Sequence, residues 1–191
     1  SIIGLLFYRD EWIWDDLAYP AAFIREAEQK GCNALAVFTN QMPDESLGMP
    51  SIRKVFNDFF TLNGETVIDV LVSAMKFSHV GNGSLTADEL EQLGVPVLTA
   101  YTLLTTEEDW RKNPEGLNAV ETSIAVALPE FDGAIHGVPI AGRNVLPDGA
   151  IEYQPMPERM AAMVDKAIKG ARLHRLKNED KKIALILHNY P

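Results

Sequence analysis

Six short apolar runs, separated by segments with helical periodicity, limit the folds open to this 191-residue chain. Each run is nearly continuous in apolar residues, which is typical of strands buried on both faces of a parallel sheet. Because strands alternate with helices, we expect a doubly wound, mostly parallel sheet with helices on both faces, a three-layer α/β sandwich of Rossmann or flavodoxin type. The predicted strands are residues 2–8, 35–38, 67–73, 95–100, 134–140 and 183–187.

Local signals place the helices between these strands. Ser51 precedes an amphipathic stretch to Phe60, and the pairs Thr86–Glu89, Thr105–Glu108 and Asn118–Glu121 have the spacing of capping boxes. We expect Pro129 to end the helix that begins near Asn118, because proline has no N–H to continue it. The turn-rich connections at 40–50 and 141–156 are predicted to be the most mobile.

Composition excludes several classes of protein. The chain has 27 acidic and 17 basic residues, so nucleic-acid binding is not expected. No apolar run approaches the roughly 20 residues of a membrane-spanning helix, and the single cysteine favours a reducing, cytoplasmic location. The start without methionine and the end after a strand-like run predict one α/β domain, residues 1–191, excised from a longer chain.

Polar residues follow several of the predicted strands. In a doubly wound sheet, ligands bind outside the carboxyl ends of the strands. The residues predicted to bind a ligand there are Tyr8, Arg9, His79, Tyr101, His188 and Asn189. The glycines after His79 lack the Lys-Ser/Thr ending of a phosphate-binding loop, and no metal-ligand spacing of histidine or cysteine is present.

Four blocks in order along the chain resemble one family. They are Ile3–Arg9, Leu93–Leu98, the Val-Ala-Leu-Pro-Glu-Phe-Asp-Gly block at 126–133, and Lys181–Pro191. Together they resemble the large, porphyrin-binding subunit of cobaltochelatase and magnesium chelatase. The resemblance implies ATP-driven insertion of Co²⁺ or Mg²⁺, as substrate, into a tetrapyrrole. It also implies ATP and its Mg²⁺ on separate motor subunits, contacts with other domains of the large subunit, no cofactor in this domain and no activity of the domain alone.

The resemblance also suggests where chemistry would occur. Metal insertion removes two pyrrole protons, and a carboxylate can accept a proton and ligate the cation. Glu130 is therefore the first candidate for a catalytic residue and Asp132 the second, both within the 126–133 block. Three alternatives stay open: that Glu130 only hydrogen-bonds the turn, that the domain is a non-catalytic scaffold, or that it is a ligand-sensing domain.

Overall fold

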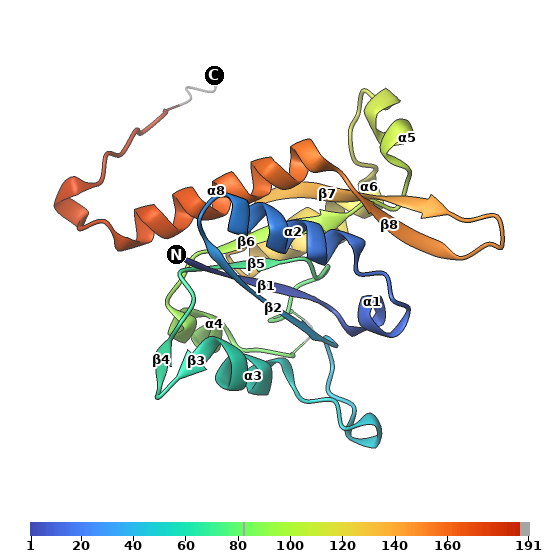
Figure 1. Cartoon of the computed structure of the whole chain (residues 1–191). Helices are drawn as coiled ribbons and strands as arrows, with labels where there is room; N and C mark the ends of the chain where they lie inside the picture. Colours follow the sequence, from blue (N-terminus) through green and yellow to red (C-terminus); the bar gives the residue numbers. More distant parts are fainter. Residues whose placement is uncertain (82, 188–191) are drawn as a thin grey trace.

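A computed structural model of the chain describes residues 1–81 and 83–187. Its main sheet has the strand order β2-β1-β5-β6-β7-β8 (Figure 1). The first five strands in this order pair in parallel, and β8 pairs antiparallel with β7. The strands are β1 (Ile2–Tyr8), β2 (Asn33–Thr39), β5 (Val70–Ser73), β6 (Val97–Thr102), β7 (Ile135–Val145) and β8 (Ile151–Pro155), with a separate hairpin of β3 (Thr61–Leu62) and β4 (Glu65–Thr66). The predicted fold class is confirmed.

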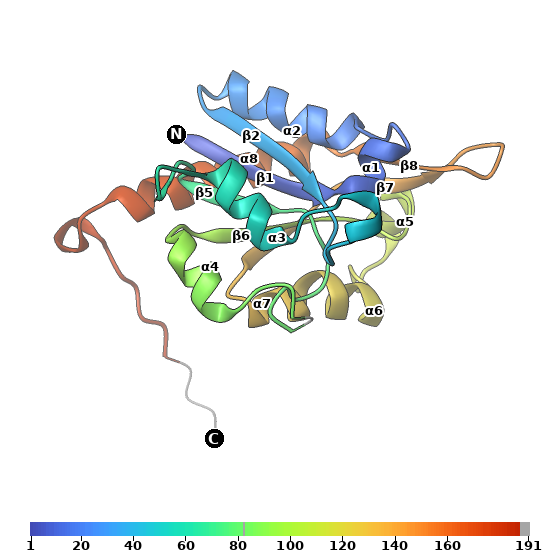
Figure 2. The same cartoon turned by 90° about the horizontal axis from the view of Figure 1, so that it is seen from below.

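Helices cover both faces of this sheet (Figures 1 and 2). On one face α2 (Ala18–Gln29) and α8 (Pro157–Arg175) pack over a core of aliphatic and aromatic side chains. On the other face lie α3 (Ile52–Val55), the π-helical η2 (Phe56–Phe60) and α4 (Ala87–Leu93). The remaining helices are α1 (Arg9–Ile13), η1 (Glu45–Leu47), α5 (Glu107–Lys112), α6 (Ala119–Thr122), η3 (Ser123–Ala127), α7 (Leu128–Phe131) and η4 (Asn178–Asp180).

The capping signals place most helix starts correctly. Thr86–Glu89 and Asn118–Glu121 form complete capping boxes. The prediction for Thr105 and Glu108 is wrong by one residue: Thr106 is the N-cap, and its hydroxyl accepts the N–H of Asp109. Either threonine satisfies the sequence pattern, so the tertiary path of the chain after β6 decides between them.

Pro129 does not end its helix, contrary to the prediction. The helix runs from α6 through the π-helical segment η3 into α7, and Leu128 N–H donates to the carbonyl of Ser123 five residues earlier. At that spacing Pro129 would be the partner of the Ile124 carbonyl, but it has no N–H. Phe77 N–H donates to the Ile124 carbonyl instead, at 2.7 Å. The wider turn thus accommodates the proline, and the freed carbonyl anchors another loop.

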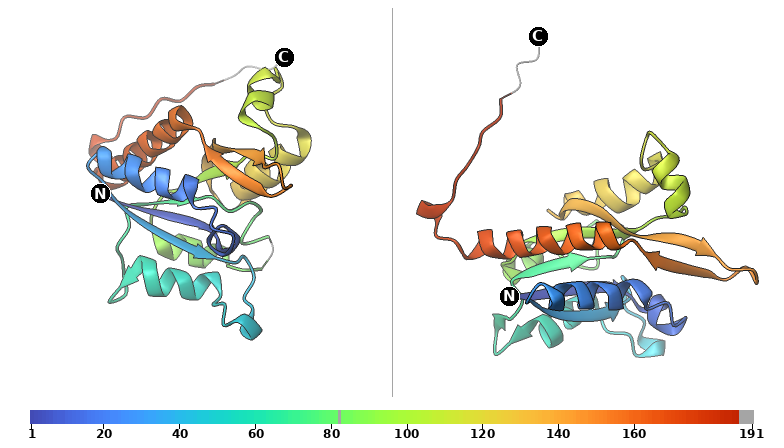
Figure 3. Two further views of the ribbon diagram at one scale, coloured as in Figure 1. Left: turned by 45° about the vertical axis from the view of Figure 1, so that its right-hand side comes forward. Right: turned by 45° about the horizontal axis from the view of Figure 1, so that its top comes forward.

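Two predictions about the second half of the chain are wrong. Residues 183–187 form no strand; the segment runs away from the domain (Figure 3), and Ile183 is 90% exposed. Here the apolar run has no neighbouring strand to pair with. Conversely, β8 occupies the sheet edge, so 141–156 is a paired hairpin rather than a mobile connection. Its strands carry few aliphatic residues because this edge is only partly buried.

A Cβ added at Gly4 of β1 would crowd the core on the sheet face that α3, η2 and α4 cover. An added Cβ would lie 2.9 Å from Ile68 Cδ1 and 3.3 Å from both Leu71 Cδ1 and Phe60 Cε1. Gly4→Ala should therefore lower the free energy of unfolding by about 1–3 kcal/mol through overpacking. Urea unfolding measures this change. Gly170→Ala in α8 is the matched control: its nearest neighbours lie at 3.9 and 4.0 Å, so it should be neutral or stabilise by up to about 1 kcal/mol. Equal stability of the two variants would contradict this packing.

Candidate functional site

The carboxyl edge of the sheet carries a group of polar side chains around Lys76, which follows β5. The strand order is that of a doubly wound sheet whose direction of winding reverses between β1 and β5. Such a reversal opens a crevice where ligands bind. Tyr8 ends β1, and Thr102 ends β6 on the other side of β5. The chain thus brings three strand ends together at the reversal point.

Hydrogen bonds with Tyr8, Gln41, Ile124 and Asp132 hold the loop after β5, residues 76–81. The first three bond to Lys76 and Phe77. Lys76 N–H donates to the Tyr8 hydroxyl at 2.9 Å, and this hydroxyl and Gln41 Nε2 donate to the Lys76 carbonyl at 3.2 and 3.1 Å. Phe77 has a φ of +68°, in the left-handed region that costs a bulky residue energy. Its N–H is held by the Ile124 carbonyl. Backbone strain persists only where surrounding contacts over-determine it.

Asp132 holds the next part of the same loop. Its Oδ1 accepts hydrogen bonds from Ser78 Oγ at 2.5 Å and Val80 N–H at 3.3 Å, and its Oδ2 accepts His79 N–H at 2.5 Å. These bonds explain why an acid follows the helix at this point, since its two oxygens satisfy three donors of the loop. Glu130, in contrast, is exposed on α7.

The side chain of Lys76 lies half-buried at the reversal point. Its ammonium donates to Thr102 Oγ1 at 2.9 Å and lies 5.7 Å from the centre of the Tyr153 ring. An ammonium has three N–H donors, and this is the one side-chain hydrogen bond it makes in the described part of the chain. Burial lowers the pKa of Lys76, and the charges of Glu11 and Glu121 oppose that effect.

A buried carboxyl group, Glu11, lies near this lysine. Tyr19 OH donates to Glu11 Oε1 at 3.0 Å, whereas the buried Oε2 has no hydrogen-bond partner among the described residues. Burial raises the pKa of Glu11 to about 7, although hydrogen bonds and the charge of Lys76 act in the opposite direction. Glu11 and Lys76 are thus both shifted toward their neutral forms. A carboxyl group whose pKa lies near 7 can accept and return a proton near neutral pH.

The predicted ligand-binding residues do not all meet at this edge. Tyr8 lies beside the Lys76 loop and holds its backbone, and Arg9 begins α1 directly after it. His79 is buried within that loop, where burial lowers its pKa and Nδ1 has no partner in the described ranges. Tyr101 belongs to a separate core near η3, and burial raises its pKa to about 12. His188 and Asn189 lie outside the described residues.

The sequence analysis did not identify Glu11 as a site residue. It lies in α1, between two exposed residues, Asp10 and Trp12, so no periodic pattern separates it from its charged neighbours. The structure buries it because Tyr19 of α2 packs over it. Among the described residues, no group of three or more His, Cys, Asp or Glu side chains is placed to hold a metal ion. Nor is any described helix long and apolar enough to cross a membrane.

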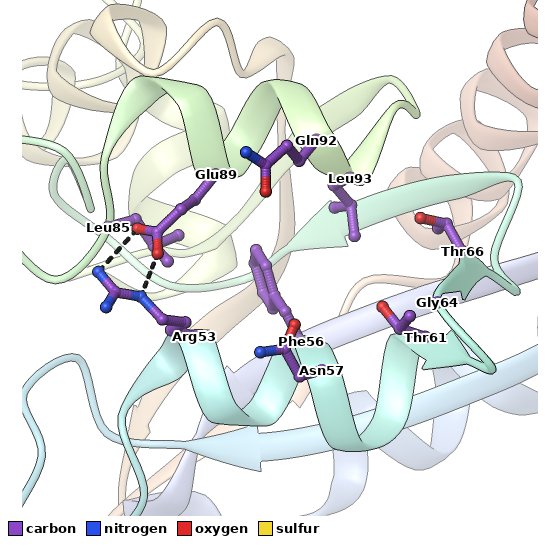
Figure 4. A pocket seen from close by; sticks show the side chains of 10 residues that line it. All are labelled: Arg53, Phe56, Asn57, Thr61, Gly64, Thr66, Leu85, Glu89, Gln92 and Leu93. Carbon is purple, nitrogen blue, oxygen red and sulfur yellow. Dashed lines mark hydrogen bonds and ion pairs between the residues drawn. The ribbon is translucent and has the colours of Figure 1, made fainter.

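A groove of about 540 Å³ lies between α3–η2 and α4, away from Lys76 (Figure 4). Its charged groups are Arg53 and Glu89, which form a two-point ion pair, with Arg53 Nη2 donating to Glu89 Oε2 at 3.0 Å. Glu89 also accepts Thr86 N–H as part of the capping box of α4. The two charges of this groove are thus paired with each other.

The fold and strand order are those of a doubly wound α/β domain. The profile of the family described as CobN/Magnesium Chelatase matches residues 1–191. The chain therefore belongs to the CobN/magnesium chelatase family.

Relatives of two kinds align over the chain. A magnesium-chelatase subunit of Rhodobacter capsulatus is 32% identical over 211 residues, covering 100% of this chain and 17% of its own length. The aerobic cobaltochelatase protein CobN of a Sinorhizobium species is 27% identical and covers 99% of this chain and 15% of its own. The catalytic subunit of cobaltochelatase from Mycobacterium tuberculosis superposes with a TM-score of 0.74 at 24% identity, over 94% of this chain and 15% of its own. The chain thus spans about a sixth of these relatives.

The raised pKa of Glu11 predicts a pH dependence of stability. The folded state holds this proton more tightly than the unfolded state, whose pKa is near 4.5. The contribution of Glu11 to the free energy of unfolding is therefore fully present below about pH 4.5 and is lost as the pH rises to about 7. Glu11→Gln keeps an acceptor for Tyr19 and should remove about 2 kcal/mol of the loss between pH 5 and 8. Urea unfolding at both pH values measures this; exposed Glu91→Gln is the control, and wild-type pH dependence in Glu11→Gln would contradict the assignment.

Asp132 should matter for stability more than Glu130 does. In Asp132→Asn an amide NH₂ replaces one acceptor and faces an N–H or O–H donor of the loop. We expect a loss of about 1–3 kcal/mol of unfolding free energy. For a chain of this size, each kcal/mol lost lowers the Tm by roughly 2–4 °C. Glu130→Gln, two residues away and exposed, should melt like the wild type in the same calorimetric experiment. Reversal of this order would show that the loop is not held as described.

Proposed function

We propose that this chain is a domain of the large subunit of an ATP-dependent metal chelatase, which inserts Co²⁺ or Mg²⁺ into a tetrapyrrole. The observation that carries the proposal is the match of the chelatase family over the whole of residues 1–191. Relatives named for both cobalt and magnesium chelation align over nearly all of the chain. The macrocycle, the other domains of the subunit and the motor subunits are the partners of this proposal, in the cytoplasm.

Metal insertion requires a proton acceptor for the two pyrrole N–H groups. Glu130 suits this role because its carboxylate is exposed on α7 and makes no side-chain hydrogen bond or ion pair within the described ranges. It is therefore accessible to a substrate held between this domain and another. Asp132 positions the adjoining loop through its three hydrogen bonds. Glu11, whose pKa burial raises to about 7, is a second group able to exchange protons near neutral pH.

The sequence offers no phosphate-binding loop of the P-loop type for ATP. The glycines at 81 and 83 follow His79, but the segment has no lysine followed by serine or threonine to hold phosphates and Mg²⁺. We therefore assign ATP hydrolysis to the motor subunits and expect the chain alone to insert no metal.

A non-catalytic scaffold is the second candidate function. The observation in its favour is the segment after η4, where Ile183, Leu185, Ile186 and Leu187 are 81–91% exposed. An apolar run of this kind is suited to packing against another domain. In that case the domain would position its neighbours and take no part in proton transfer.

Glu130→Gln in a full-length subunit that contains this chain decides between these functions. It removes the proton acceptor and keeps the shape, so the rate of metal insertion by the assembled enzyme should fall about 10²–10⁴-fold. The melting temperature should not change. Initial rates with Co²⁺ and with Mg²⁺ are followed by the absorbance change of the tetrapyrrole.

Two controls accompany this measurement. Asp132→Asn should lower the melting temperature, which Glu130→Gln should not. The isolated 191-residue chain should show no insertion. A Glu130→Gln enzyme with normal turnover would remove Glu130 from the mechanism and favour the scaffold.

A further inference from the structure

A second groove, of about 520 Å³, lies at the opposite edge of the sheet from Lys76. It is formed by the last turns of α8 and the starts of β6 and β7, where Leu98 and Ile135 are paired across the sheet. Pro96, Leu98, Ile135 and Leu173 make its apolar surface. Ile135 and Leu173 are about half exposed, at 47% and 53%. Grooves of this volume are of the size that binds small molecules.

The rim of this groove is basic, although the chain has a net charge of −10. Five of its ten lining residues are basic and none is acidic: His136, Lys166, Lys169, His174 and Lys181. Within residues 1–81 and 83–187, the side chains of all but Lys181 form no hydrogen bond or ion pair, and Lys181 Nζ donates to Asn178 Oδ1 at 2.9 Å. Elsewhere on α8, Arg175 is paired with Asp69 and Asp165 with Lys30. Lys166 and Lys169 thus line the groove without a carboxylate partner among the described residues.

The backbone of β7 is distorted where it forms the wall of the groove. Between the pairs Leu98–Ile135 and Ala100–Val138, β7 carries one extra residue, which is a β-bulge. Within it His136 adopts a φ of +62°, an uncommon conformation for a residue with a side chain. Bulges of this type re-aim a side chain and recur near functional sites. Here the bulge places His136 on the rim of the groove.

We propose that this groove binds a flat apolar molecule with carboxylates on its edge, and that the tetrapyrrole substrate is such a molecule. The proposal rests on the proposed function, which supplies a ligand of this chemistry. The ring would lie on the apolar surface, and its carboxylates would pair with Lys166 and Lys169, one turn apart on α8. Charge-assisted hydrogen bonds to a carboxylate are stronger than neutral ones, so the lysines would determine both affinity and orientation. Gly170 leaves the groove open, because an added Cβ there would meet no atom closer than 3.9 Å.

Titration of the 191-residue chain with deuteroporphyrin, a porphyrin with two propionates, tests this site. Fluorescence quenching should give saturable binding that weakens as salt rises. Lys166→Gln/Lys169→Gln should raise the Kd at least about tenfold, because two charged contacts are lost. Both lysines are exposed, so the double variant should fold normally. Gly170→Phe should abolish binding by filling the groove without changing its charge.

Two controls separate this site from non-specific adsorption. Lys182→Gln removes an exposed charge that does not line the groove and should bind like the wild type. The dimethyl ester of the same porphyrin has no carboxylates, so its binding should be weaker and unaffected by the lysine substitutions. A Kd within twofold of wild type in the double variant, equal binding of acid and ester, or no binding by the wild type would each overturn the site. None of these results affects the Glu130 experiment, which measures metal insertion by the assembled enzyme.

Discussion

The loop after β5 depends on hydrogen bonds from four parts of the chain, and much of the carboxyl edge depends on that loop. Tyr8 from β1, Gln41 beyond β2, Ile124 in η3 and Asp132 after α7 all bond its backbone or its serine hydroxyl. Such a network can hold a bulky residue, Phe77, in a left-handed conformation. The strain is local, and the strained residue directly follows Lys76. Loss of one anchor would therefore affect the site as well as the fold.

Burial then determines the chemistry available at that edge. Glu11 and Lys76 would be ordinary charged surface groups in an unfolded chain. Packing of Tyr19 and the strand ends around them penalises both charged forms, so one pKa rises and the other falls. The Lys76 edge is thus suited to moving protons, whereas the α8 groove is suited to holding an amphipathic anion. The sheet keeps these two environments at opposite ends of its strands.

The chain spans about a sixth of the relatives it matches, and several of its surface features are open. Glu130 is exposed at a helix end, the α8 groove is open, and the apolar segment 183–187 extends from the body (Figures 1 and 3). Each is a surface that a neighbouring domain or a substrate could cover. This is consistent with the proposal that a substrate is held between this domain and another.

The sequence by itself determined the layered fold, because unbroken apolar runs and helical spacing are local consequences of burial on two faces. It also located Ser51, Thr86 and Asn118 as helix starts, since capping needs only residues three apart. Only the tertiary structure decided the rest. The run at 183–187 looks like a strand but lacks a partner, and Pro129 continues a helix because a π-turn moves the bonding register. Glu11 becomes a buried acid through Tyr19 packing over it, and Asp132 becomes a structural anchor through a loop more than fifty residues away. Those contacts join residues that no local pattern relates, so their energies exist only once the chain has folded.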